Sequence, residues 1–424
     1  MDSYAGRIVD GELDELLAGL PAISLEGPKG VGKTATAQRR AATTLALDEV
    51  SQVELLVADP ARLDTSPTPV LVDEWQRHPP AWDLVRRSVD REASPGRFLL
   101  TGSASPTNQP THSGAGRIVQ LRMRPMSLAE RAVERPTVSL RLLLTGTAPD
   151  VDGDTAVALT DYAAEIVRSG FPGIRRLPAR ACRAQLDGYL SRIVEREFPE
   201  LGHVVRRPAT LRAWLRAYAA ATSTTAAYNA ILDAATPGET DKPAKTTTIG
   251  YRDALTQLWL LEPVPGWLPT RSVFARLAQA HKHHLADPAL AARLLGTSAA
   301  ALLAGRDPAR AAPSEGPLLG ALFESLVTLS VRVYAQAAEA TVHHLRTRNG
   351  DHEVDLIVER DDGRVVAMEV KLNPSVGEAD VKHLRWLRER LGDQLLDSVV
   401  ITTGRHAYRR TDGIAVVPAA LLGA

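Results

Sequence analysis

The stretch Gly27-Pro-Lys-Gly-Val-Gly-Lys-Thr34 decides the fold of the N-terminal part of this chain. It follows a short apolar run, Ala22–Leu25, and precedes a helix-forming run that begins at Ala35. The stretch fits the pattern G-x-x-x-x-G-K-[ST], which forms a phosphate-binding loop between a strand and a helix. Glycines let several backbone N–H groups point at one phosphate, and the positive end of the following helix adds to the attraction.

We therefore predict that this loop binds a nucleoside triphosphate. Lys33 is expected to reach the β- and γ-phosphates, and the Thr34 hydroxyl is expected to ligate Mg²⁺. The alternative is a glycine-rich loop that only turns the chain. The predicted nucleotide contacts are Gly27, Pro28, Lys29, Gly30, Val31, Gly32, Lys33 and Thr34.

Two further apolar runs end in residues that suit the same chemistry. The run that ends in Asp73 and Glu74 reads as a buried parallel strand, whose carboxyl end opens on a ligand crevice. Asp73 is expected to hold the Mg²⁺ shell, and Glu74 to orient and polarise the attacking water. A later strand ends in Leu100-Thr-Gly-Ser103, where Thr101 or Ser103 is placed to touch the γ-phosphate or that water.

Composition restricts the remaining possibilities. The chain has 424 residues, enough for two or three domains, and its 44% hydrophobic content allows a sizeable core. Lys plus Arg equals Asp plus Glu at 50 each, so nucleic-acid binding would need a local basic patch. Cys182 is the single cysteine, which excludes an intrachain disulfide and suggests a small buried side chain. We find no signal peptide and no apolar run near 18 residues, and expect a soluble cytoplasmic protein without membrane contact.

Local patterns divide the chain into four parts. Residues 1–130 alternate strand and helix signals, which predicts an α/β fold with a parallel sheet covered by helices on both faces. In that part we expect strands over 22–26, 53–58, 70–73 and 98–102, and a helix over 33–47. The predicted parts are the P-loop NTPase sheet (1–130), a helical lid or linker (131–202), a winged-helix-like helical region with a wing-like strand at 260–264 (203–310), and a second α/β domain (316–424).

The C-terminal domain carries a second group of charged residues. Asp355 lies on one apolar strand, and Glu369-Val-Lys371 lies on the next. Because residues i and i+2 of a strand face the same side, Glu369 and Lys371 share a face that Asp355 can join. Glu324, on an upstream helix, can add a further carboxylate. Carboxylates bind a divalent metal that activates water, and a lysine can position it, so the pattern predicts phosphodiester hydrolysis. The alternative is a solvated Glu–Lys pair on a hairpin.

With both groups in view, the chain resembles a bacterial and archaeal family of AAA-type ATPases whose C-terminal domain looks like the PD-(D/E)XK nuclease (restriction-endonuclease-like) fold. The resemblance implies ATP and Mg²⁺ binding by Lys33, Thr34 and Asp73, with Glu74 catalytic. Arg117 lies in a drifted motif and is either an arginine that faces the γ-phosphate, in cis or in trans, or a surface residue. The matching segments are Asp73–Arg77, Leu100–Ser103, Ser113–Arg117, Pro125–Glu130, Gly170–Pro172, Tyr189–Glu197, Phe323–Glu324, Glu353–Asp355 and Glu369–Lys371.

Two functions follow from these predictions. In the first, ATP binding or hydrolysis shifts the middle region and gates a C-terminal nuclease site, with Mg²⁺ on Glu324, Asp355 and Glu369. In the second, the chain is a nucleotide-dependent switch or scaffold whose C-terminal domain binds a partner without cutting. ATP is the expected ligand of both, and DNA, RNA and a second copy of the chain are the further candidate partners. We expect residues 281–284 to lie on a solvated helix face. The arginines between 168 and 216 form either a phosphate-tracking patch or a dispersed set.

Overall fold

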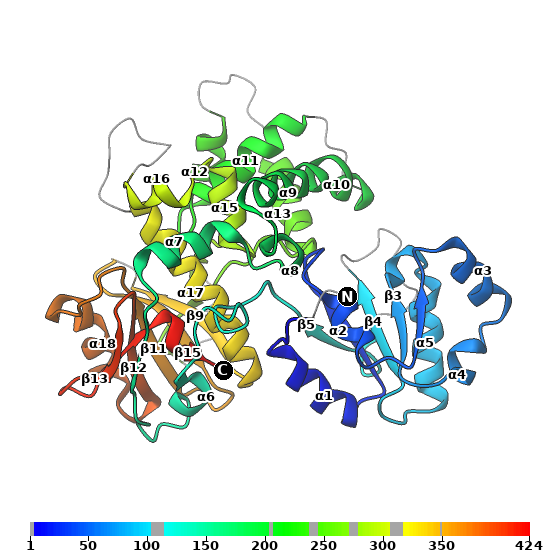
Figure 1. Ribbon diagram of the computed structural model, residues 1–424, viewed down its shortest axis with the longest axis horizontal. Coiled ribbons are helices and arrows are strands. Elements are labelled where there is room, and N and C mark those ends of the chain that lie inside the picture. Colours follow the sequence, from blue (N-terminus) through cyan, green and yellow to red (C-terminus); the bar gives the residue numbers. More distant parts are fainter. Residues whose placement is uncertain are drawn as a thin grey trace.

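The computed structural model describes residues 4–102, 114–202, 207–236, 245–270, 279–305, 317–347 and 350–424. Within these ranges the strands form sheets of five, eight and two members. Figure 1 shows the N-terminal sheet at one side, the largest sheet at the other, and a group of helices above them.

The N-terminal sheet is parallel throughout, with the order β2-β3-β4-β1-β5 among the described residues. Strands β1, β3 and β4 are almost wholly buried, as their continuous apolar sequences predict. Because all five strands run the same way, their carboxyl ends meet at one edge. The elements are α1 (Val9–Gly19), β1 (Ala22–Glu26), α2 (Lys33–Gln38), β2 (Thr43–Ala46), α3 (Val50–Ala58), α4 (Arg62–Thr65), β3 (Val70–Asp73), η1 (Trp75–Arg77), α5 (Pro80–Arg91), β4 (Phe98–Gly102) and β5 (Val119–Arg122).

Two predicted elements in this unit are wrong. The helix predicted over 33–47 ends at Gln38, and residues 43–46 form the edge strand β2 instead. The strand predicted over 53–58 belongs to helix α3, on which Val50 and Val57 are largely exposed. A short apolar run without strict alternation does not distinguish a helix from a strand, and the paired threonines at 43 and 44 were the better strand signal.

The middle region is mostly helical. Within the part of the chain that the structure describes, residues 260–264, predicted as a wing-like strand, form no named strand and make isolated antiparallel bridges, from Leu261 to Leu285 and from Val264 to Lys282. The helices are α6 (Leu140–Leu143), α7 (Leu159–Arg168), α8 (Pro172–Arg175), α9 (Ala179–Arg192), η2 (Ile193–Glu197), α10 (Phe198–Glu200), α11 (Pro208–Ala220), α12 (Tyr228–Ala235), α13 (Lys245–Gln257), α15 (Pro288–Leu294) and α16 (Ala299–Leu303).

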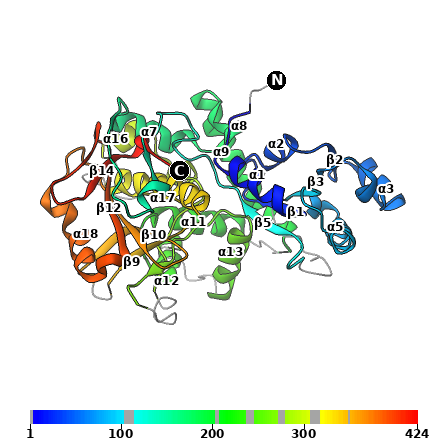
Figure 2. The ribbon, with the colours of Figure 1, turned by 90° about the horizontal axis from the view of Figure 1, so that it is seen from below.

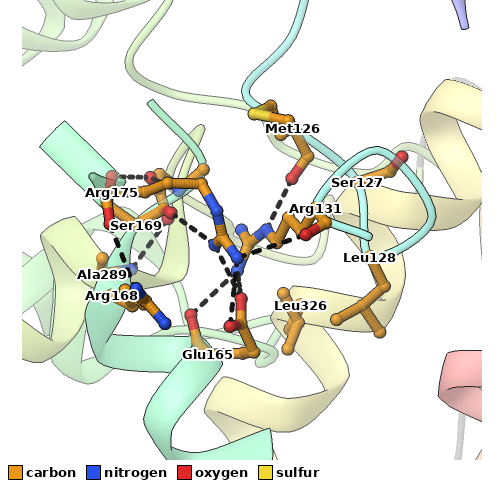
Figure 3. Close-up of polar contacts among 12 residues, drawn as sticks. Met126, Ser127, Leu128, Arg131, Glu165, Arg168, Ser169, Arg175, Ala289 and Leu326 are labelled. Carbon is orange, nitrogen blue, oxygen red and sulfur yellow. Dashed lines mark hydrogen bonds and ion pairs between the residues drawn. The ribbon is translucent and has the colours of Figure 1, made fainter. Parts of the chain in front are cut away.

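A buried ion-pair network fixes the end of the N-terminal unit to this helical region (Figure 3). The Arg131 Nη1 donates to the Glu165 carboxylate at 3.2 Å and to its backbone oxygen at 2.8 Å. Arg131 also donates to the Met126 oxygen at 2.8 Å, and Arg175 adds a 2.8 Å bond to Glu165. Burial would raise the pKa of Glu165, but the two guanidinium groups outweigh it and lower that pKa. The network therefore holds α7 and α8 against the segment that follows β5.

The arginines between 168 and 216 do not all face solvent together. Arg175 is held inside this network, and Arg196 and Arg212 pair with glutamates of their own region. These pairs favour the dispersed arrangement over a continuous basic patch.

The largest sheet has the order β7-β13-β14-β12-β11-β10-β9-β8 in the part of the chain described. Its edge strands β7 and β8 come from outside residues 316–424, so the sheet extends beyond the predicted C-terminal domain. Sheet edges accept any segment that satisfies their backbone groups, wherever it lies in the sequence. The elements are β6 (Val138–Ser139), β7 (Gly153–Asp154), β8 (Gly266–Trp267), α17 (Pro317–Ala337), β9 (Thr341–Arg346), β10 (Glu353–Glu359), β11 (Val365–Val370), α18 (Glu378–Leu391), η3 (Gly392–Gln394), β12 (Leu395–Thr402), β13 (His406–Arg409), β14 (Ala415–Pro418), η4 (Ala419–Leu421) and β15 (Leu422–Gly423).

Helix α17 is the central helix of the protein. Its residues Leu318–Ala337 are long and apolar enough to cross a membrane by length and composition, which corrects the expectation that no such run exists. In the structure 72% of that window is buried inside the protein. The helix packs on β9 and also against α7, α15 and α1. Figures 1 and 2 show it between the largest sheet and the N-terminal unit. Its apolar character is therefore explained by its place in the core.

Candidate functional site

The predicted phosphate-binding loop joins β1 to α2 at the carboxyl edge of the N-terminal sheet. Gly27 has φ 154°, and a Cβ at this position would lie 2.1 Å from the backbone oxygen of Met123. Gly30 and Gly32 also have positive φ, at 80° and 108°. Helix α2 has only six residues, so the loop amides, more than the helix, must provide the attraction for an anion.

The ammonium of Lys33 lies inside the loop. Its side chain is almost fully buried, and Nζ donates to the backbone oxygens of Gly27 at 2.8 Å and Pro28 at 3.1 Å. Burial lowers the pKa of Lys33 to about 8, against the opposing charges of Glu74 and Asp73. A phosphate in the loop would compensate this buried charge and favour the protonated lysine.

The structure brings the first turn of α2 and the ends of β3 and β4 together at one carboxylate. Thr34 Oγ1 donates to Asp73 Oδ1 at 2.8 Å, and Thr101 Oγ1 donates to the same oxygen. Asp73 and Thr101 are both buried. The loop, β3 and β4 therefore bring hydroxyl and carboxylate oxygens together, which is the donor set that Mg²⁺ prefers.

Glu74 follows Asp73 in a left-handed conformation, with φ 52° and ψ 42°. Gln76 Nε2 donates to Glu74 Oε2 at 2.7 Å and so orients this carboxylate. Ser103, which we predicted as a further contact, lies outside the described residues.

Arg117 is placed differently from the prediction of a phosphate contact in cis. Strand β5 pairs with β1 in parallel, with Ile23 opposite Val119 and Glu26 opposite Arg122. Arg117 precedes β5 and lies at the amino edge of the sheet, whereas the phosphate-binding loop follows β1 at the carboxyl edge. Its half-exposed side chain donates to Asp90 Oδ1 at 2.8 Å. The cis role is therefore wrong, and a role in trans stays a prediction.

Arg7 braces the loop and was missed by sequence reasoning. Its buried guanidinium donates to the backbone oxygens of Val31 at 2.9 Å and Arg124 at 2.6 Å, and to Glu130 at 3.0 Å. Glu130 lies in a segment that carries the family resemblance, but no motif marks Arg7. A lone arginine 20 residues before the loop gives no sequence signal, because only folding places it there.

A cavity of about 440 Å³ opens beside the loop, between the N-terminal unit and the middle region. Lys29 lines the cavity on the side of the loop and forms a 3.0 Å ion pair with Glu197 of η2. The residues that line the cavity are Lys29, Gly30, Phe171, Gly173, Ile174, Gln185, Gly188, Tyr189, Arg192, Ile193, Glu197, Leu258 and Leu260.

A second contact between the two units centres on Glu262. Arg122, at the end of β5, donates to its carboxylate, and Arg332 of α17 donates to it at 2.6 Å. The Arg122 guanidinium also lies 3.6 Å from the centre of the Trp259 ring. Burial would raise the pKa of Glu262, but Arg122, Arg124 and Arg332 outweigh it and hold this pKa well below its ordinary value.

The structure also brings the predicted C-terminal residues together. Lys371 Nζ lies 2.7 Å from Glu369 Oε2 and 4.0 Å from Asp355 Oδ2, so the two side chains do share a face. Asp355 Oδ2 accepts the Val370 N–H at 3.0 Å. Glu324 reaches the same cluster from α17.

Lys282 was not predicted in this cluster. Its Nζ lies 2.9 Å from Glu324 Oε1, 3.1 Å from Asp355 Oδ1 and 3.4 Å from Glu353 Oε1. Burial would lower the pKa of Lys282, but Asp355 and Glu324 outweigh it and raise that pKa.

The solvated helix face predicted at 281–284 is therefore wrong, because Lys282, His283 and His284 are buried and not helical. The described residues contain no group of three His, Cys, Asp or Glu side chains arranged to hold a metal ion. The metal set predicted on Glu324, Asp355 and Glu369 is thus not formed, because the Lys282 ammonium lies between two of its three carboxylates.

Comparisons with known proteins match three separate parts of the chain. Residues 20–132 match a family model described as an AAA domain, and residues 159–301 and 319–422 match two models described as domains of unknown function. Uncharacterized proteins of Mycobacterium bovis and Mycobacterium tuberculosis are each 28% identical over 410 residues, which is 94% of this chain and 80% of theirs.

Two solved structures show more distant likeness. A Walker-type ATPase of Pyrococcus abyssi has TM-score 0.38 and 15% identity, over 67% of this chain and 94% of that one. The ORC2 protein of Aeropyrum pernix, described as ADPNP–ADP complexes, has TM-score 0.30 and 17% identity, over 70% of this chain and 95% of that one. The family match and the loop geometry together support a P-loop ATPase in the N-terminal part, and the C-terminal match names no activity.

Proposed function

We propose that the protein is a Mg²⁺-dependent ATPase. The observation that carries the proposal is the meeting of Thr34, Thr101 and Asp73 beside the buried ammonium of Lys33. These groups match the parts that P-loop enzymes use to bind a triphosphate and its metal.

Each residue has a distinct task in this proposal. Thr34 and Asp73 would hold Mg²⁺, which when bound neutralises phosphate charge. Lys33 exchanges its bonds to loop carbonyls for bonds to phosphate oxygens, and the loop amides bind the remaining oxygens. Glu74, held by Gln76, accepts a proton from the attacking water as a general base.

The cavity beside the loop suits the nucleoside. Its volume of about 440 Å³ lies in the range of small-molecule sites, and apolar side chains such as Ile174 and Leu258 line it next to Gly30. Helices α8 and α9 form its far wall, so binding there would draw the middle region toward the loop.

ATP state is proposed to act on the rest of the chain through two contacts. Lys29 of the loop pairs with Glu197 of the middle region. Arg122 lies opposite Glu26, the last residue before the loop, and connects through Glu262 to α17. The output is either a C-terminal nuclease or a switch that binds DNA, RNA, a protein or a second copy of the chain, and the position of Lys282 favours the switch.

Calorimetry with ATP at millimolar Mg²⁺ tests the proposal. Wild type should bind ATP, and Lys33→Ala should bind at least a hundredfold more weakly. Lys382→Ala, which removes an exposed lysine on α18, is the matched control and should bind as wild type does. Glu74→Gln should retain binding but lose at least a hundredfold in turnover. ATP affinity unchanged in Lys33→Ala would refute the proposal.

A further inference from the structure

The acidic cluster of the C-terminal domain contains its own cation. Glu324 on α17, with Glu353 and Asp355 on β10, directs three carboxylates at one point. The Nζ of Lys282 occupies that point, at 2.9, 3.4 and 3.1 Å from their oxygens. An ammonium carries three N–H donors, so each carboxylate has one donor available to it.

The backbone around Lys282 holds the side chain in this position. Its N–H and C=O exchange hydrogen bonds of 2.9 and 2.8 Å with Val264, in the segment just before β8. Strand β8 joins the same sheet as β10, beside β9. The side chain is 1% exposed. Lys282 is thus buried and held by an isolated antiparallel bridge near the edge of the sheet, and it is not a surface lysine that happens to reach an acid.

A divalent metal does not fit this arrangement. Protein oxygens lie about 2.0–2.6 Å from Mg²⁺ or Ca²⁺, so an ion bound to Glu324 and Asp355 would need the space that Nζ fills. The ion would also face an adjacent buried ammonium of the same sign. Lys371 already pairs with Glu369 on the other side of Asp355.

We propose that Lys282 replaces the divalent cation in this cluster, so that the C-terminal domain does not act as a metal-dependent nuclease while Lys282 is in place. The cluster instead joins the segment around residue 282 to α17 and β10. This inference does not depend on ATP binding, and its test uses the protein without nucleotide.

Titration of the full-length protein with Mn²⁺ is the first test. Wild type should show no site in the C-terminal cluster at submillimolar Mn²⁺, and Asp355→Asn should change its Mn²⁺ binding by less than twofold. A wild-type site that disappears in Asp355→Asn would overturn the proposal. Plasmid nicking by wild type with Mn²⁺ that is lost in Glu369→Ala would overturn it as well.

Removal of the ammonium is the second test. Lys282→Met should gain one Mn²⁺ site, at least tenfold tighter than any in wild type, and adding Glu324→Gln should remove it. Lys382→Met is the control and should gain none. If Lys282→Met does not fold alone, added Mn²⁺ should restore its melting transition, and the wild-type titration decides independently. A folded Lys282→Met that gains no site would refute the proposal.

Discussion

The contact between the ATPase unit and the rest of the chain should depend strongly on one carboxylate, Glu262. Its side chain is 13% exposed and lies among three guanidinium groups, with Arg332 at 2.6 Å and Arg124 at 3.6 Å, and Arg122 in direct contact. Glu262→Gln keeps the size of the side chain but leaves three buried cations without their shared anion. Breaking a buried ion pair by removing one partner costs about 3–5 kcal/mol.

Hydrogen exchange followed by mass spectrometry can measure this loss locally. A cost of about 3–5 kcal/mol corresponds to exchange that is roughly a hundred to several thousand times faster in peptides covering β5 and residues 259–264. Asp187→Asn is the matched control, because Asp187 pairs with Arg293 at 2.6 Å on an exposed surface, where a pair contributes about 1 kcal/mol or less. Exchange in Glu262→Gln no faster than in this control would refute the reasoning.

An acid titration and two variants near the loop test other parts of this reasoning. The pKa of Glu262 in the folded protein lies below its ordinary value of 4.5, so its contribution to the free energy of unfolding is present above pH 4.5 and is lost as pH falls. Acid titration followed by tryptophan fluorescence should therefore show wild type losing its stability advantage over Glu262→Gln below about pH 4.5. A stability difference that stays constant with pH would contradict this. Arg7→Ala should weaken ATP binding about tenfold or more in calorimetry because it releases the Val31 carbonyl of the loop, and unchanged affinity would exclude a bracing role. Gly27→Ala should weaken ATP binding at least tenfold because its Cβ would lie 2.1 Å from the Met123 oxygen. Gly11→Ala on α1, where an added Cβ meets nothing within 4 Å, is the control and should bind as wild type does, and equal losses would count against the clash.

The sequence predicted which strand ends lie next to the glycine-rich loop, because the signals for buried parallel strands and for the loop are local. The bounds of β1, β3 and β4 agree with the predicted strands, since buried parallel strands read as continuous apolar runs. In a parallel sheet the ends of such strands must share an edge, so strand order and motif spacing were enough to place Lys33, Thr34 and Asp73 together. This reasoning does not apply to Arg117, because Arg117 lies just before β5 and therefore at the amino edge of the sheet, opposite the loop.

The C-terminal cluster shows the limit of the same approach. The spacing of Glu369 and Lys371 fixed their common face, because strand periodicity alone decides it. Lys282, in contrast, lies 42 positions before Glu324 and 73 before Asp355. Nothing in the local pattern around residue 282 distinguishes a buried counter-ion from a solvated lysine.

The amino-acid sequence by itself thus determined the glycine-rich loop between β1 and α2, the position of Asp73 at the end of β3 beside that loop, and the face that Glu369 shares with Lys371. Folding decided which distant charges complete each group: Arg7 behind the loop, Glu262 between three arginines, and Lys282 among three acids. The physical reason is the distance along the chain over which each factor acts. Backbone periodicity and glycine geometry act over a few residues, whereas a buried charge selects its partners by proximity in space, which the chain order does not specify.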